Sequence, residues 1–223
     1  MFPKVLIECS PYLLAMAIVG VIYASLAAWA ETDFKRLLAY SSLAHINFIL
    51  AGLFVWSHAP HTGAIFQSFN HGITIAALFL LADWLSDKIQ TQSLGNVSGL
   101  VKYLPHLCWV TLFFILSSVG LPGLNNFVGE LMILLGVFGH YPWAAALLGT
   151  SIILSVAYML RWFQSIFFGS PSPLNRTLHD IGWKKVAILL PLILLVLWLG
   201  LFPSNIVNPI QSHMIVASNE ESL

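Results

Sequence analysis

The chain has 223 residues, no formal net charge at pH 7, 58% hydrophobic residues and only 8% charged residues. In an ordinary soluble domain, charged residues make up roughly a quarter of the total. This composition therefore excludes a soluble domain and indicates a multi-span membrane protein. The balanced charge, without a dense basic cluster, also argues against a nucleic-acid-binding protein.

Seven apolar segments follow one another along the chain. They cover residues 11–30, 34–56, 63–85, 105–119, 127–138, 143–168 and 184–201. The fourth and fifth are too short to cross the about 30 Å of a hydrocarbon core alone, because a helix rises about 1.5 Å per residue. Between them, Gly120, Pro122 and Gly123 break the helix without adding charge. We therefore interpret 105–138 as one discontinuous span.

The Lys and Arg residues test this interpretation, because basic residues accumulate in cytoplasmic loops. If the two short segments cross separately, the nine basic residues divide five to four between the two sides. If they form one broken crossing, the division is eight to one, with Lys4 alone outside. The sequence thus predicts an all-α polytopic fold of about six transmembrane helices, with both termini on the non-cytoplasmic side.

The expected organisation has five parts. A lead-in over 1–10 precedes a transmembrane region over 11–168, and a cytoplasmic loop over 169–183 leads to a closing helix over 184–202 and a polar tail over 203–223.

Three ionisable residues fall near the middle of three different apolar segments: His45, His71 and Glu130. Glu130 is the one acidic residue well inside such a segment. A charged carboxylate at bilayer depth costs about 2.5–3.5 kcal/mol on insertion scales, so chains that keep one there usually use it to move ions or protons. Histidine titrates near neutrality and can pass a proton through either ring nitrogen. The three residues therefore predict a proton pathway, although a buried histidine can also be a packing residue.

Neutral polar residues on the same segments can hold bridging waters or bond to helix carbonyls. These supporting residues are Ser41, Ser42, Ser68, Asn70, Thr74, Ser117 and Ser118. Lys35 and Asp33, at a helix entrance, are interpreted as an interfacial anchor and a capping acid. No catalytic nucleophile, phosphate-binding loop or metal-binding cluster is predicted.

Two motifs resemble a known family. Residues 31–42, ETDFKRLLAYSS, followed by His45, resemble the Thr-Asp-x-Lys-Arg-x-x-Ala-Tyr-Ser/Thr-Ser segment of the antiporter-like membrane subunits of respiratory complex I. Residues 120–123, GLPG, followed by NFVGE at 126–130, resemble the broken-helix motif of the chain M type. Other antiporter-like chains typically carry lysine where Glu130 stands, so this residue favours chain M.

The resemblance extends from about residue 11 to residue 203 and implies a specific function. It makes 11–168 an antiporter-like repeat of a proton-pumping NADH:quinone oxidoreductase in the bacterial cytoplasmic membrane. The equivalent of Glu130 ends the outward proton half-channel, the equivalents of His45 and His71 lie on its hydrated axis, and Lys35 matches the motif's lysine near the cytoplasmic surface. NADH, FMN, iron-sulfur clusters and quinone are expected elsewhere in the complex, with no redox chemistry on this chain. The expected partners are neighbouring antiporter-like subunits and the lipid bilayer.

Subunits of this type are much longer than this chain, which corresponds to their C-terminal portion. We expect a fragment, a truncated reading frame or one piece of a split subunit, which would not complete a proton path alone. Two alternatives stay open. One is a cation/proton antiporter or hydrogenase-linked membrane subunit, and the other is a truncated chain without transport.

Overall fold

The computed structural model describes residues 3–89, 98–170 and 178–220, and helices dominate these ranges. The helices are α1 (Pro3–Ala30), α2 (Phe34–Leu53), α3 (His58–Ile89), the short 3-10 helix η1 (Leu100–Lys102), α4 (Pro105–Ser118), α5 (Asn125–Phe138), α6 (Pro142–Phe167), α7 (Trp183–Leu201) and α8 (Ser204–Glu220). No strand occurs in the described ranges.

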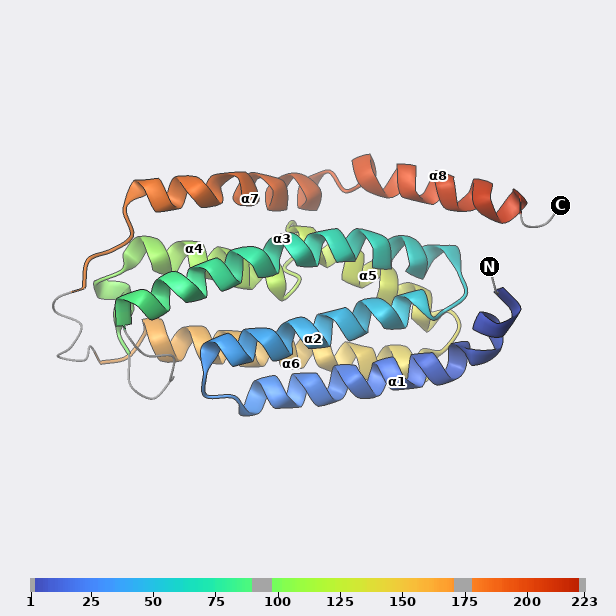
Figure 1. Cartoon of the computed structure of the whole chain (residues 1–223), viewed down its shortest axis with the longest axis horizontal. Helices are drawn as coiled ribbons and strands as arrows, with labels where there is room; N and C mark the ends of the chain where they lie inside the picture. Colours follow the sequence, from blue (N-terminus) through green and yellow to red (C-terminus); the bar gives the residue numbers. More distant parts are fainter. Residues whose placement is uncertain (1–2, 90–97, 171–177, 221–223) are drawn as a thin grey trace.

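Five of these helices are long and apolar enough to cross a membrane: Glu8–Ala30 of α1, all of α2, Ala59–Ile89 of α3, α6 and α7. Helices α4 and α5 have 14 residues each, which corresponds to about 21 Å of helix. They follow one another in line (Figure 1), so together they supply one further, interrupted crossing. The all-α polytopic fold with a discontinuous span is therefore confirmed.

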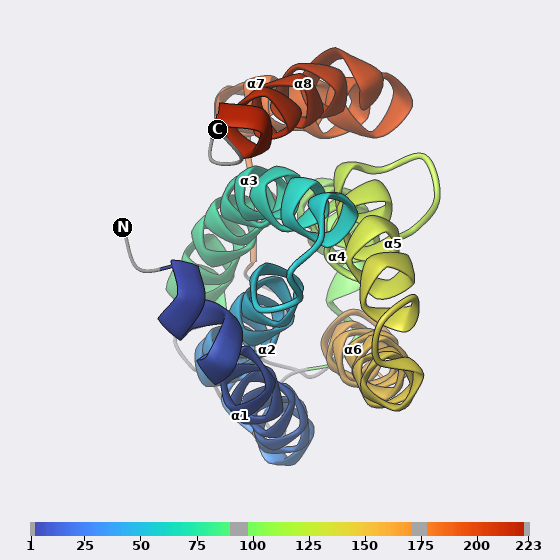
Figure 2. The same cartoon turned by 90° about the vertical axis from the view of Figure 1, so that its right-hand side faces the viewer.

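Helices α1, α2, α3, α4–α5 and α6 form a bundle around a shared interior, as the end-on view in Figure 2 shows. Helices α7 and α8 run along one side of this bundle, next to α3 (Figure 1). The start of α1 and the end of α8 lie at the same end of the molecule (Figure 1). An even number of crossings requires this arrangement, which agrees with the expected topology.

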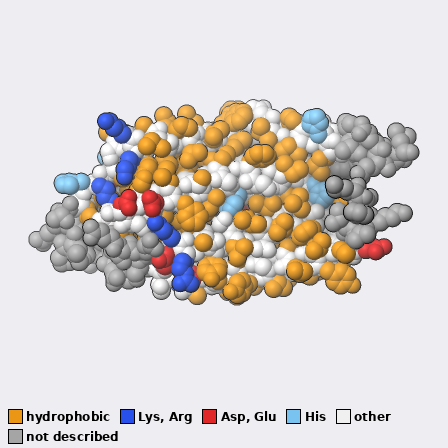
Figure 3. All heavy atoms as spheres, viewed as in Figure 1, with side chains coloured by type: hydrophobic (Ala, Val, Ile, Leu, Met, Phe, Trp, Pro, Cys, Tyr) orange, Lys and Arg blue, Asp and Glu red, His pale blue; other side chains and the backbone are white. Residues whose placement is uncertain are grey.

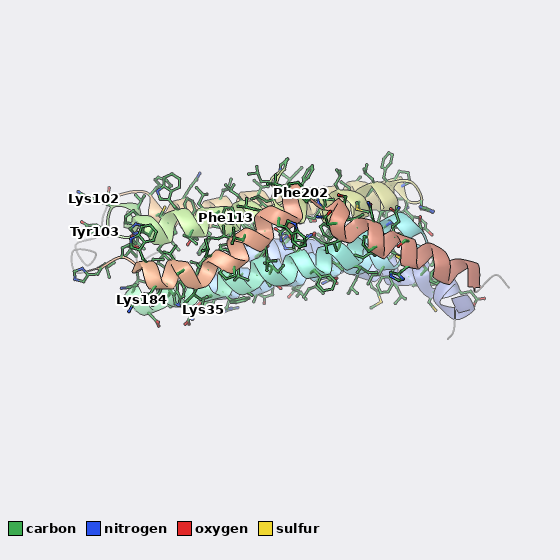
Figure 4. All side chains as sticks on the ribbon, turned by 90° about the horizontal axis from the view of Figure 1, so that it is seen from above. Lys35, Lys102, Tyr103, Phe113, Lys184 and Phe202 are labelled. Carbon is green, nitrogen blue, oxygen red and sulfur yellow. The ribbon has the colours of Figure 1, made fainter. Side chains whose placement is uncertain are left out.

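Charged side chains mark one end of the bundle. On the face in Figure 3, most Lys, Arg, Asp and Glu side chains gather towards one end, while hydrophobic side chains cover the middle. Figure 4 places Lys35 at the start of α2, Lys102 in η1 and Lys184 at the start of α7 at this same end. The Lys35 ammonium pairs there with the Asp83 carboxylate at 2.9 Å, and Asp33 caps α2 by accepting a hydrogen bond from the Arg36 backbone N–H.

The interior of the bundle alternates between apolar and polar layers. Along α2, the buried Leu37 and Leu38 belong to one hydrophobic cluster and the buried Phe48 and Ile49 belong to another, while His45 and other polar residues lie between them. Buried polar residues at 67–74 of α3 and at 151–155 of α6 lie between the same two clusters. A polar layer therefore crosses the bundle between two apolar ends.

The break between α4 and α5 follows from glycine chemistry. Gly120 has a φ of 71°, the left-handed conformation that ends many helices. The Gly120 N–H bonds the Ser117 carbonyl at 3.2 Å and the Leu121 N–H bonds the Leu116 carbonyl at 3.0 Å, which is the Schellman pattern of a helix end. Pro122 then lacks a backbone donor and Gly123 has a φ of 93°, so the chain cannot continue as a helix.

Helix α7 packs directly against this break. A Cβ atom at Gly200 would lie 2.6 Å from the Leu124 carbonyl carbon and would also overlap the Gly123 carbonyl oxygen. Glycine at this position thus lets α7 approach the unwound segment, and α7 covers part of the irregular backbone as a membrane interior requires.

Two helix boundaries differ from the expected organisation. Helix α1 begins at Pro3, within the expected lead-in, and the expected polar tail contains α8. Helix α8 lies along α3, where the Thr62 hydroxyl donates to the Met214 sulfur at 3.5 Å. Packing on a neighbouring helix stabilises a helix whose own sequence has no continuous apolar run.

Candidate functional site

Glu130 lies on α5, one turn beyond its first residues, and only 6% of its surface is exposed. Its Oε1 atom lies 3.6 Å from His45 Nε2 and accepts a hydrogen bond from Gln67 Nε2 at 3.2 Å. Three different helices, α2, α3 and α5, thus converge on one buried carboxyl group.

The two predicted histidines also lie together. The rings of His45 and His71 are stacked, with centroids 5.2 Å apart and planes inclined by 24°. His71 Nε2 is hydrogen-bonded to the Ser42 hydroxyl at 3.0 Å. The structure therefore brings Ser42 and the three predicted residues into one chain of contacts, in the order Ser42, His71, His45, Glu130.

The orientation of His45 follows from its backbone contact. His45 Nδ1 lies 2.8 Å from the Ser41 carbonyl oxygen, and because a carbonyl can only accept, Nδ1 carries the proton. In the neutral ring, Nε2 is then the acceptor that faces Glu130. The Tyr158 hydroxyl donates to the Ser41 hydroxyl at 2.9 Å, so α6 fixes the helical turn that orients this imidazole.

The other carboxyl oxygen of Glu130 lies against the helix break. A Cβ atom at Gly120 would be 2.7 Å from Oε2, too close for any other residue without a shift. Gly120 thus has two structural roles. Its positive φ ends α4, and its lack of a side chain leaves room for the Glu130 carboxyl group.

A network of amide and hydroxyl groups fixes the start of α5. Asn125 Nδ2 donates to the Asn70 carbonyl at 3.0 Å, and Asn70 Nδ2 donates to the Asn125 carbonyl at 2.8 Å. Asn126 Nδ2 donates to the Ser117 carbonyl at 2.9 Å, and the Thr74 and Ser117 hydroxyls are 3.0 Å apart. The Ser117 carbonyl lies in the last turn of α4, where no following turn supplies a helical donor. The other bonds tie the start of α5 to α3 and to the end of α4.

A cavity adjoins Glu130 and His45 on the side of α1 and α6. Water-sized molecules can place their centres in about 20 Å³ of it, and one water needs about 10–15 Å³ by this measure. The remaining polar residues in its wall are Ser25, Ser151, Ser155 and Tyr158.

The predicted supporting residues lie partly in the polar layer and partly away from it. Ser41, Ser42, Asn70, Thr74 and Ser117 make the contacts described above, and Ser118 is buried at the last residue of α4. Ser68 bonds the Ala64 carbonyl within its own helix, whereas Lys35 and Asp33 lie at the charged end of the bundle.

Sequence reasoning did not identify Gln67, Ser25 or Tyr158. Gln67 lies four residues before His71, one helical turn away on the same face, and this spacing was the available signal. Ser25 and Tyr158 carry no such signal, because their place at the cavity depends on how α1 and α6 pack. Among the described residues, no three His, Cys, Asp or Glu side chains lie close enough to hold a metal ion.

The buried carboxyl group, the two histidines and the interrupted helix lie together inside the bundle. The family profile described as NADH:quinone oxidoreductase/Mrp antiporter, TM, matches residues 1–155. The chain belongs to this family.

Individual relatives agree with this assignment. NADH-quinone oxidoreductase subunit M of Rhodobacter capsulatus is 34% identical over 219 residues, which cover 96% of this chain and 43% of that protein. Subunit M of Mycobacterium tuberculosis is 36% identical over 213 residues, which cover 94% of this chain and 38% of that protein. The chain therefore spans less than half the length of these curated relatives, and its resemblance to the chain M type is confirmed.

Solved structures show the same fold. A chain in respiratory complex I from Thermus thermophilus with bound NADH superimposes with a TM-score of 0.88 at 32% identity, over 94% of this chain and 45% of that chain. A chain of the Mrp complex from Dietzia superimposes with a TM-score of 0.80 at 23% identity, over 89% of this chain and 46% of that chain; this shows a shared fold. The chain is accordingly a multi-pass protein of the bacterial cytoplasmic membrane.

Proposed function

We propose that the chain forms part of a membrane subunit of a proton-pumping NADH:quinone oxidoreductase and carries protons in its outward half-channel. The proton moves along His71 and His45 to Glu130, and the redox cofactors belong to other subunits. The observation that carries this proposal is a buried carboxyl group 3.6 Å from an imidazole that is itself stacked on a second imidazole.

The geometry suits exchange better than a fixed ion pair. Direct N–H···O hydrogen bonds measure about 2.7–3.2 Å, so the His45–Glu130 contact at 3.6 Å leaves the two groups adjacent without locking them together. His45 presents Nε2 to the carboxyl group, so a protonated Glu130 faces an acceptor. Between His45 and His71, a water molecule can carry the proton where the rings only stack.

The proposed division of the chain follows from this function. Residues 11–168 form the antiporter-like repeat with its broken helix at 105–138, 169–183 form a cytoplasmic loop, and 184–202 form a closing helix. The lead-in over 1–10 lies on the non-cytoplasmic side. In the segment 203–223, α8 runs beside α3 from the level of the break, where α7 ends, towards that same side.

The proposed partners are neighbouring antiporter-like subunits. Leu121, Pro122 and Gly123 of the break are exposed on the surface of this chain. Irregular backbone at membrane depth occurs where protein or a wet cavity covers it, not where it faces lipid. A second membrane subunit packed on this segment supplies that cover.

A cation/proton antiporter is the second candidate, because the family profile names both kinds of protein. Identities of 34% and 36% with complex I subunits, against 23% with the Mrp chain, favour the first. Proton transport that is driven by NADH oxidation and needs no sodium gradient would support the first candidate over the second.

Replacement of Glu130 by Gln tests the proposal in membrane vesicles that contain the assembled complex. The variant keeps the shape of the side chain but cannot bind and release a proton. We expect NADH-driven proton uptake to fall at least about tenfold, since a positioned proton donor typically contributes about 10²–10⁴-fold. The measurement is the initial rate of vesicle acidification.

Two further variants serve as references for the size of the Glu130→Gln effect. Glu8 is exposed near the start of α1, so Glu8→Gln should leave acidification unchanged. His71→Ala should reduce acidification less than Glu130→Gln, because water can bridge the gap that the lost ring leaves. Normal acidification in Glu130→Gln vesicles would refute the proposed pathway.

A further inference from the structure

Ser25 on α1 is buried completely, with 0% of its surface exposed. Its hydroxyl has no hydrogen-bond partner within the described parts of the chain. A buried hydroxyl without a partner is unfavourable, because folding removes it from water without replacing the bonds that water made.

The same hydroxyl lines the cavity beside Glu130 and His45. This cavity offers about 20 Å³ to the centres of water-sized molecules, which is room for one or two waters on the scale of about 10–15 Å³ for each. Its wall also contains Ser151, whose hydroxyl donates to the Leu148 carbonyl at 2.6 Å and keeps its lone pairs free to accept. A water here meets the several polar partners that ordered buried waters require.

Glu130 has hydrogen-bonding capacity left for such a water. Within the described residues, its one direct hydrogen bond is the 3.2 Å bond that Gln67 donates to Oε1. A carboxylate can accept about four hydrogen bonds, and a protonated carboxyl group also donates one. The cavity is the adjoining space from which a further partner can reach it.

We propose that Ser25 positions an ordered water in this cavity, and that this water hydrogen-bonds Glu130 and provides a second route for proton exchange beside the histidines. The inference rests on the proposed function for its proton-carrying role, while the water site itself rests on the cavity and the unpartnered hydroxyl. Helix α1 thereby takes part in the site through a neutral side chain, since Ser25 is its residue in the cavity wall.

The first test is a cryo-electron microscopy map of the assembled complex at a resolution that shows waters. We expect density for a water within hydrogen-bonding distance of Ser25 Oγ in the natural chain, and no such density in Ser25→Ala. An empty cavity in the natural chain would overturn the inference whatever Glu130→Gln does. A water present in the natural chain with normal proton uptake in Glu130→Gln would instead refute the proposed function and leave the water site standing.

The second test is NADH-driven acidification of vesicles. Ser25→Ala should slow proton uptake about two- to tenfold, the range that loss of one hydrogen bond produces, and Ser25→Thr, which keeps a hydroxyl, should restore most of it. Ser86→Ala is the matched control, because the Ser86 hydroxyl also has no partner in the described chain but does not line this cavity. Equal rates in Ser25→Ala and Ser86→Ala would overturn the second route.

Discussion

Glu130 has two oxygens in different surroundings. Oε1 faces polar groups of α2 and α3, namely His45 and Gln67, while Oε2 lies beside the backbone of Gly120. The side chain is therefore positioned by the helix break as much as by its hydrogen bonds. A residue that changes the break without touching the hydrogen bonds should still change proton transfer.

The substitution Gly120→Ala tests this position. An added Cβ would lie 2.7 Å from Glu130 Oε2, and a non-glycine residue at left-handed φ costs about 1–2 kcal/mol. We expect a lower unfolding temperature of the complex together with a clear loss of proton uptake.

Gly123→Ala is the control that adds backbone strain at the same break without a contact to Glu130. Gly123 also has a positive φ, of 93°, but a Cβ there would meet nothing within 4 Å. It should lower stability by a similar amount and leave proton uptake close to normal. Equal losses of uptake in the two variants would show that the contact with Glu130 has no part in transport.

At the scale of elements, the discontinuous α4–α5 span depends on its neighbours. Asn70 and Thr74 of α3 hold the first residues of α5, and Gly200 lets α7 approach the unwound segment. An interrupted helix inside a membrane leaves polar backbone groups that other protein must cover or satisfy. The closing helix α7 is thus expected to stabilise the break directly.

Gly200→Ala tests the role of α7. The new Cβ would lie 2.6 Å from the Leu124 carbonyl carbon, and overpacking of this kind costs about 1–3 kcal/mol. We expect less chain in the membrane and a lower unfolding temperature. Gly149→Ala in α6, where a Cβ meets nothing within 4 Å, should be neutral or stabilise the helix by about 0.5–1 kcal/mol; if both variants behave alike, α7 does not support the break.

At the scale of the whole molecule, sequence patterns predicted the spans and the central residues for physical reasons. Membrane helices require long apolar runs, and an ionisable group inside such a run is costly, so Glu130, His45 and His71 stood out. Gln67, Ser25 and Tyr158 did not, because neutral polar residues in apolar helices are common and their convergence depends on packing. Helix α8 was not predicted because its sequence has no long apolar run. In the structure it packs against α3.

The two hydrophobic clusters isolate the polar layer from both ends of the bundle. Proton exchange at Glu130 during turnover is the central claim about this layer, and infrared difference spectroscopy of the assembled complex during NADH oxidation tests it most directly. We expect a carboxyl band that changes with turnover and is absent from Glu130→Gln, with the band retained in Glu8→Gln. A turnover spectrum that is identical in the natural chain and in Glu130→Gln would contradict the account.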